Sequence, residues 1–407
     1  MATATVDRSA GTRRISLILW RSAVLLGGLL AAILVLRAGA DGWLAGENPV
    51  VAARWAPGKA RAAMAAARSY VGRGKVTDPH VRRLVADALD EDATLPSAIE
   101  LAALEANEAG DHGKAARLFH LSDAISRRSL PTRLWLIQTS VDRGDVAGAL
   151  RDFDIALRTS TDAPKLLFPV LARASDDPTL VAPIARLLDR PSDWRLTFLR
   201  DAVTDYGAAP GIAAVTLRMR NRSWLIANQI DETVIGELIA QDRYAEARVV
   251  QDAFHPITHD EGLIRDPAFA DDSARYPFGW RIEEQGEIGA RRSRANGRSV
   301  LTYQSLSDGS GPVATQLLIL PRGRYRLVTR TALHAADETA VPFWTVTCAE
   351  EGGPQITLLD QPQTGLAEAD FVTPPGCGAQ WLTLNLRGSD RPDGQSGAIA
   401  DVVVVRR

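Results

Sequence analysis

The hydrophobic pattern of this 407-residue chain changes its period part-way along, and this change constrains the fold more than any other feature. Up to about residue 255, the apolar residues recur at the spacing of amphipathic helices. From Pro277, where the chain reads PFGWRI, apolar and polar residues alternate, as they do in strands with one buried face. The sequence therefore predicts a multidomain α plus β protein, with helices over 47–255 and a β domain over 262–407.

Within the helical region, two segments repeat at an interval of 34 residues, the tetratricopeptide (TPR) period. The residue pairs at this interval are Gly110 and Gly144, Asp111 and Asp145, Ala115 and Ala149, and Phe119 and Phe153. Glycine and aspartate favour a turn between antiparallel helices, and a small alanine lets the helices approach closely. A degenerate third copy begins at Asp242. We predict a TPR-like α-solenoid; an ordinary helical bundle with a coincidental match is the alternative.

The β domain contains about nine short alternating segments, separated by turns rich in Gly, Pro, Asp and Asn. This number in some 130 residues predicts a two-sheet, jelly-roll-like β-sandwich. Trp280 and Trp344 alternate in phase with apolar neighbours, which places both in the expected core. The expected strands are Phe278–Glu284, Ser299–Ser305, Ala314–Leu320, Arg324–Leu333, Phe343–Ala349, Ile356–Leu359, Ala369–Thr373, Gln380–Arg387 and Ala398–Val405.

The amino terminus contains an apolar segment, ISLILWRSAVLLGGLLAAILVL, that begins at Ile15. Its length matches the roughly 20 residues that a helix needs to cross a bilayer. Three arginines precede it, so the positive-inside rule predicts a cytoplasmic N-terminus (1–14), a transmembrane signal anchor (15–37) and periplasmic C-terminal domains, in a single-pass inner-membrane protein. A signal cleaved after Ala40 and a twin-arginine signal are the alternatives.

The two cysteines, Cys348 and Cys377, are too few for a disulfide-rich scaffold or a four-cysteine zinc site. Export would place them in an oxidising compartment, and both lie beside expected strands, so we predict that they form a disulfide. In the chain-entropy model, closing a loop of this length stabilises the fold by about 3–4 kcal/mol. Two separately buried thiols are the alternative.

Several segments resemble a largely uncharacterised family of Gram-negative bacterial tetratricopeptide proteins that are anchored in the membrane. These segments are RWAP (54–57), ISRRSLPTRLWLIQTSVDRGD (125–145), LLFPVLA (166–172), DWRLTFL (193–199), DPAF (266–269) and PFGWRI (277–282). The family pattern has asparagine and aspartate where this chain has Asp266 and Gly279. The resemblance implies a C-terminal β domain and an association with envelope polysaccharide production.

The β domain also resembles non-catalytic carbohydrate-binding modules, through GRYRL (323–327), a late cysteine before a strand, and a terminal ADVVV (400–404). Strand phase places Trp381, Asn385 and Arg387 on the face opposite Leu382, Leu384 and Leu386; Arg326 points outward on its own strand. An outward tryptophan with amide and guanidinium neighbours can stack on a sugar ring and bond its hydroxyls. The alternative is that Trp381 packs beneath a helix or loop.

Motifs of known catalytic chemistry are missing from the sequence. Pro256 breaks the helix that would place His255 and His259 on one face, and no HExxH frame surrounds them. The segment Gly72-Arg73-Gly74-Lys75 lacks the remaining residues of a phosphate loop. We therefore expect no catalytic residues, no metal and no cofactor, although two carboxylates brought together only in space would escape this search.

A net charge of −2 and a pI near 6.3 give no basic footprint for nucleic acid. The features together predict a non-catalytic scaffold or adaptor of the cell envelope, active in exopolysaccharide or envelope assembly. Its helical repeats would bind protein partners, its sandwich would bind a polysaccharide, and its single helix would hold it in the inner membrane. The alternative is an enzyme that modifies envelope polysaccharide through a carboxylate site.

Overall fold

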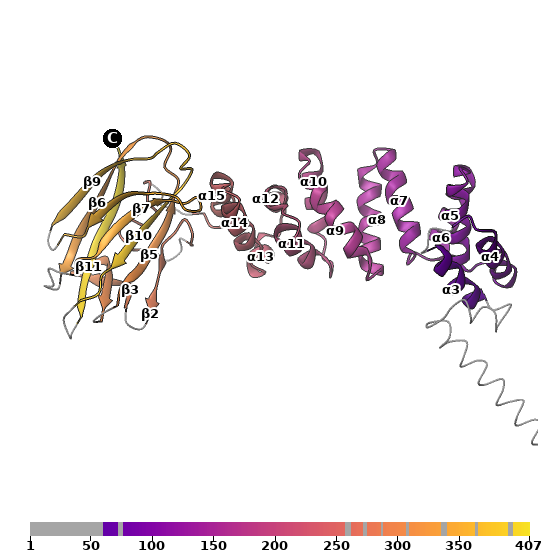
Figure 1. Ribbon diagram of the computed structural model, residues 1–407, viewed down its shortest axis with the longest axis horizontal. Helices are drawn as coiled ribbons and strands as arrows, with labels where there is room; N and C mark the ends of the chain where they lie inside the picture. Colours follow the sequence, from indigo (N-terminus) through magenta and orange to yellow (C-terminus); the bar gives the residue numbers. More distant parts are fainter. Residues whose placement is uncertain are drawn as a thin grey trace, which may run out of the picture. The chain divides into compact units, whose positions relative to one another are not determined.

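The computed structural model describes residues 60–71, 76–256, 262–271, 275–285, 288–306, 309–334, 340–362, 365–389 and 394–407 (Figure 1). The chain divides into two compact units, Met1–Ala163 and Pro164–Arg407. The expected change from helix to strand at 255–262 lies inside the second unit, where α15 ends at Phe254 and β1 begins at Arg281. The second unit therefore contains helices as well as the β domain.

The first unit contains helices that begin at proline or behind a polar cap. Two of them begin at Pro79 and Pro96. Proline is well suited to this first position, because a backbone N–H there would have no partner within the helix. The described helices pack mainly as the hairpins α3/α4, α5/α6 and α7/α8. Their bounds are α3 Ala60–Val71, α4 Pro79–Glu91, α5 Pro96–Glu108, α6 His112–Ile125, α7 Leu130–Asp142 and α8 Val146–Thr159.

The 34-residue repeat corresponds to two hairpins, α5/α6 and α7/α8, whose turns are built alike. Gly110 and Gly144 adopt φ values of +80° and +70°, a conformation that side chains disfavour. Asp111 and Asp145 then cap α6 and α8, each accepting a hydrogen bond from the backbone N–H three residues later, at 2.9 and 2.8 Å. The other four repeat residues, Ala115, Ala149, Phe119 and Phe153, are buried. Membership of the tetratricopeptide class and binding of protein partners remain predictions.

A buried ion network joins three helices of the first unit. Arg133 of α7 is 2% exposed and contacts Asp123 of α6, while its Nη1 lies 2.7 Å from Asp152 Oδ1 of α8. Leaving one buried charge without its partner typically costs about 3–5 kcal/mol. This network therefore fixes α7 against both of its neighbours.

The second unit contains the remaining helices, and its last hairpin, α14/α15, carries the degenerate third repeat. Asp242 takes the place of the turn glycine with φ +57°, and the Tyr244 hydroxyl donates to its Oδ1 at 2.7 Å. Ala247, which corresponds to Ala115, is fully buried. The helices are α9 Ala163–Ala174, α10 Pro178–Leu188, α11 Arg195–Thr204, α12 Ala209–Arg218, α13 Arg222–Ala227, α14 Ile230–Ala240 and α15 Tyr244–Phe254.

Two antiparallel sheets follow the helices and form a β-sandwich (Figure 1). The five-stranded sheet has the order β1-β5-β10-β7-β8, and the six-stranded sheet the order β2-β3-β4-β11-β6-β9. The strands are β1 Arg281–Ile282, β2 Glu284–Gln285, β3 Ile288–Ala295, β4 Arg298–Ser305, β5 Gly311–Leu318, β6 Arg324–His334, β7 Phe343–Cys348, β8 Gln355–Asp360, β9 Leu366–Val372, β10 Gln380–Leu386 and β11 Gln395–Arg406.

Each expected strand has a counterpart in the sandwich, but the sequence reading missed β3, and the first expected strand is divided between β1 and β2. Only Arg281 and Ile282 of PFGWRI pair in the ladder with β5, while Pro277 and Phe278 lie in a turn. The strand predicted at PFGWRI is therefore a short edge strand.

The core of the sandwich contains the two expected tryptophans. Trp280 is 4% exposed and Trp344 fully buried, and their ring centroids lie 5.8 Å apart. Each indole N–H finds an acceptor: Trp280 donates to the Asp266 carbonyl at 3.0 Å, and Trp344 donates to Gln361 Oε1 at 2.9 Å. The prediction that both rings are buried is confirmed.

The inner-membrane location expected from the sequence needs correction. No helix in the part of the chain that the structure describes is long and apolar enough to cross a bilayer. This finding stands against a single-pass inner-membrane protein, and we do not retain that location. The predicted span, 15–37, lies outside the described residues, as do 1–14 and His259.

Candidate functional site

The face of the five-stranded sheet that points away from the sandwich core is called the outer face here. On the central strand β10, Leu382, Leu384 and Leu386 face the core, so Trp381, Thr383 and Asn385 belong to the outer face. All three are partly exposed. The outward phase predicted for Trp381 and Asn385 agrees with this arrangement.

A row of threonines crosses the outer face at its centre. Thr383 pairs with Thr315 on β5 and with Thr345 on β7, so the three side chains are direct cross-strand neighbours. Asn385 Nδ2 donates to Thr345 Oγ1 at 3.2 Å and to the Thr383 carbonyl at 3.4 Å. Within the described residues, no hydrogen bond engages the hydroxyls of Thr315 and Thr383 or Asn385 Oδ1. The row therefore offers free donors and acceptors on a fixed frame.

Arg387 follows directly after β10, at the end of the strand beyond Asn385. Its guanidinium carbon lies 4.2 Å from the centroid of the Phe343 ring, and Nη1 lies 2.9 Å from Asp360 Oδ1. Nη1 also donates to the Val341 carbonyl. Asp360 already pairs with the charge of Arg387, and Phe343 covers one face of its guanidinium. Arg387 therefore offers a ligand a flat stacking surface more than a free hydrogen-bond donor.

At the other end, Trp381 borders a cleft. Its ring stacks on Tyr276, with centroids 6.0 Å apart and planes inclined by 14°. The cleft has a volume of about 670 Å³ and lies between this pair and helix α14. Its lining residues are Glu232, Ile235, Gly236 and Ile239 of α14, together with Arg275, Tyr276, Pro277, Trp280 and Trp381. Trp381 therefore has features of both predicted arrangements: it points outward from its strand, and it also packs against a loop.

Past Trp381, the side of the outer face toward β5 is buried. Ala379 continues its outward phase, and Leu317 pairs directly with Trp381 on β5. These two residues are 0% and 1% exposed, and neither belongs to the sandwich core. The outer face therefore has an open half around Thr383 and a half beyond Trp381 that is buried toward β5, while Thr347, which pairs with Trp381 on β7, stays partly exposed.

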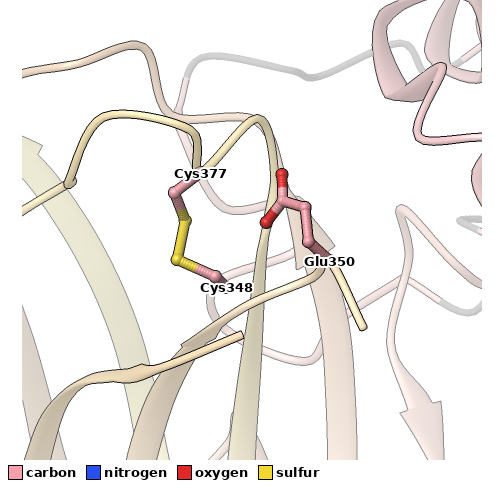
Figure 2. Close-up of side chains that lie close together, drawn as sticks. All are labelled: Cys348, Glu350 and Cys377. Atoms are coloured by element: carbon pink, nitrogen blue, oxygen red, sulfur yellow. A yellow bond between two sulfur atoms is a disulfide. The ribbon is translucent and has the colours of Figure 1, made fainter. Parts of the chain in front are cut away.

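The loops beside the buried half are held by a disulfide and a carboxylate (Figure 2). Cys348 at the end of β7 bonds to Cys377, with Cα atoms 5.4 Å apart, as the sequence predicted. Glu350 Oε1 accepts a hydrogen bond from the backbone N–H of Gly378 at 2.6 Å. A Cβ placed on Gly378 would lie 3.4 Å from the ring of Tyr244, which is ordinary contact distance, so this loop packs against α15.

Tyr244 stays protonated at this junction. Burial, with Asp242 and Glu350 nearby, raises the pKa of its hydroxyl well above the usual value. Cys348, Glu350 and Cys377 also bring three potential metal-ligand atoms within 4.8 Å of one another. Both sulfurs are bonded to each other, which removes the two thiolates that a metal ion would need.

The four predicted ligand-binding residues do not converge. Trp381, Asn385 and Arg387 share the five-stranded sheet, but Arg326 lies on β6 of the six-stranded sheet. There Arg326 forms a bidentate pair with Asp370, at 2.6 and 2.8 Å, and also contacts Glu368. This pairing lowers the pKa of Asp370. Strand phase identified an outward arginine but could not show which sheet carried it.

Sequence reasoning missed Tyr276, the threonines of β5 and β7, and helix α14. Tyr276 precedes the first strand and carries no periodic signal, and Gly236 lies inside an ordinary helix. The threonines were visible as the outward positions of two expected strands. Their alignment with Thr383 depends on strand order, which phase alone does not give.

No protein-family model matches the chain, and no curated protein matches its sequence. Among solved structures, TmCBM61 in complex with β-1,4-galactotriose has 16% identity and a TM-score of 0.26, and the match covers 36% of this chain and all of that one. A family 4 carbohydrate-binding module has 16% identity and a TM-score of 0.27, covering 35% and 99% of the two chains. The GH115 glucuronidase BtGH115A has 11% identity and a TM-score of 0.19, covering 81% and 48%. At these scores the similarity identifies neither a ligand nor an activity.

Proposed function

We propose that the outer face of the five-stranded sheet binds a neutral glycan without cleaving it. The observation that carries this proposal is the partly exposed row Thr315–Thr383–Thr345, beside Asn385 and between two ring systems. Sugars present hydroxyls around the ring edge and C–H groups on the ring face. Side-chain hydroxyls and amides complement the former, and aromatic rings complement the latter.

The length of the outer face along β10 fits a short stretch of sugar chain. Trp381 and Asn385 are four residues apart on β10, which corresponds to about 13 Å at the usual rise of a strand. Phe343 lies directly across from Asn385, so the stretch of β10 from Trp381 to Asn385 has an aromatic ring near each end. An oligosaccharide lying along β10 would contact Trp381 first, then Thr383, and then Asn385.

The charges around this face favour a neutral ligand. Arg281 pairs with Glu283 at 2.8 Å, Arg275 with Glu232 at 2.9 Å, and Arg387 with Asp360. An acidic glycan would have to compete with these carboxylates for each guanidinium.

Titration calorimetry on the full chain tests the proposal, with linear β-1,4-galactan, xylan and a mixed-linkage β-glucan as neutral probes and polygalacturonate as an acidic one. We expect at least one neutral polymer to bind and polygalacturonate not to. Thr383→Val and Asn385→Ala should each weaken binding about tenfold, since each leaves a sugar hydroxyl without its partner. Arg326→Ala, on the opposite sheet, is the matched control and should bind like wild type. If the wild type and all three variants bind equally tightly, the binding site lies elsewhere.

A further inference from the structure

The cleft beside Trp381 gives the proposed glycan face a closed end, and this inference rests on the proposed function. Along β10 and the residue before it, the outward positions change from half-buried at Asn385 and Thr383 to fully buried at Ala379. Across the sheet, Leu317 is buried in the same way. A sugar chain that followed β10 past Trp381 would therefore meet protein on the side of β5.

Helix α14 forms the far wall of the cleft and contains a glycine with no packing reason. Gly236 lies in the middle of α14 without positive φ, and a Cβ built there would meet no atom within 4 Å. Glycine inside a helix costs about 1 kcal/mol relative to alanine. Neither conformation nor crowding requires it; Gly236 lines the cleft, and the space around a Cβ at this position is open.

The rim of the cleft offers polar groups suited to a sugar that ends a chain. Glu232 and Arg275 are each about half exposed and pair at 2.9 Å. The Tyr276–Trp381 stack lies on the other side, next to the threonine row. A terminal sugar has one hydroxyl more than an internal sugar at the position of the missing linkage. A carboxylate and a guanidinium together can accept from and donate to that hydroxyl.

We infer that the protein recognises the end of a neutral glycan chain, with the terminal sugar in the cleft between α14 and Trp381 and the following sugars along Thr383 and Asn385. The cleft is within the usual size of small-ligand sites, which accommodates a terminal unit. A groove open at both ends would instead bind anywhere along the polymer.

Stoichiometry on the full chain distinguishes the two modes. The probes are matched pairs of a linear hexasaccharide and its polymer, from β-1,4-galactan, β-1,4-xylan and β-1,4-glucan, measured by calorimetry and light scattering. End recognition predicts a single protein bound per chain whatever the chain length, and equal molar affinity for hexasaccharide and polymer. Several proteins per polymer chain would overturn end recognition while leaving the glycan-binding face in place. No binding to any pair would reject both proposals.

Substitutions at Gly236 test the cleft itself. Gly236→Phe should fill the space beside Trp381 and weaken hexasaccharide binding at least about tenfold, as expected when a buried contact pocket is lost. Gly236→Ala leaves most of the cleft open and should bind like wild type while raising the melting temperature slightly. Circular dichroism checks that both variants are folded. If a folded Gly236→Phe variant binds as tightly as wild type, the cleft is not part of the site.

Discussion

Tyr276 lies parallel to Trp381, with ring centroids 6.0 Å apart, although 105 residues separate the two in the sequence. Tyr276 belongs to the segment that enters the sandwich, and Trp381 to the central strand of the five-stranded sheet. The pair stands where the outer face passes from open to buried. It connects the packing of the helices on the sandwich with the surface proposed to bind a glycan.

The first prediction concerns the energy of this pair. In a double-mutant cycle, Tyr276→Ala and Trp381→Ala should show a coupling of about 0.5–1.5 kcal/mol in the free energy of unfolding, the usual value for aromatic pairs. The cycle is measured by urea denaturation of the full chain. Tyr276→Ala combined with Arg326→Ala, on the other sheet, is the control and should be additive within about 0.5 kcal/mol. Additivity for the aromatic pair would mean that the stack contributes nothing specific.

A second prediction concerns Trp280, which is almost fully buried and packs against Phe269 and Trp344. Trp280→Ala should destabilise the second unit by about 3–5 kcal/mol, because it leaves a large cavity. Trp280→Phe keeps much of the ring but leaves the Asp266 carbonyl without its indole donor, so its cost should be smaller. Denaturant unfolding followed by near-ultraviolet circular dichroism measures both. A loss of less than about 1 kcal/mol for Trp280→Ala would contradict the packing described here.

The sandwich could be predicted from the sequence where its strands alternate cleanly. On β10, Leu382, Leu384 and Leu386 specify the core side without any knowledge of neighbours. The missed strand β3 shows the limit of this argument. Arg292 occupies a core-side position there, opposite Leu301, and is neutralised by Asp266 at 3.5 Å. In the sequence, a charged residue at a core-side position interrupts the alternation of apolar and polar residues, and its partner 26 positions away is not apparent.

The candidate site could be predicted only where one strand carried it. Trp381 and Asn385 lie on β10, and phase alone gave their common face. Gly236 and Tyr276 reach the same place through contacts distant in sequence, which no local pattern records. Arg326 was grouped with them because an outward position was known and its sheet was not. Strand order, and with it the meeting of residues from different elements, depends on tertiary packing.

The third prediction concerns the disulfide between Cys348 and Cys377, which closes a loop with a sequence separation of 29. Reduction should lower the free energy of unfolding by about 3–4 kcal/mol in the chain-entropy model. The double variant Cys348→Ala, Cys377→Ala should start at the lower stability and should not respond to reductant. Mass spectrometry of the unreduced, unfolded protein after alkylation should detect no free thiol. Two alkylated cysteines would show that the bond does not form in solution.

The last prediction concerns pH and Glu100, a residue of α5 that is 5% exposed. Burial raises the pKa of its carboxyl group above the usual value, although the Ser129 hydroxyl donates to Oε2 and Arg68 lies nearby. A carboxyl group with a raised pKa in the folded state favours folding while it is neutral. Its stabilising contribution is complete below the unfolded pKa of about 4.3, and it is lost as the pH rises through the folded pKa.

Glu100→Gln should therefore unfold at a higher urea concentration than wild type at pH 7, because a neutral amide replaces a buried charge and its Oε1 can still accept from Ser129. The difference should shrink as the pH approaches 4, where the wild-type carboxyl group is also neutral. Glu108→Gln, on an exposed residue of the same helix, is the matched control and should differ from wild type by less than about 0.5 kcal/mol at pH 7. The measurement is the urea midpoint of unfolding of wild type and both variants, taken at several pH values between 4 and 8. A Glu100→Gln variant that is less stable than wild type at pH 7 would mean that the charged carboxylate stabilises the fold.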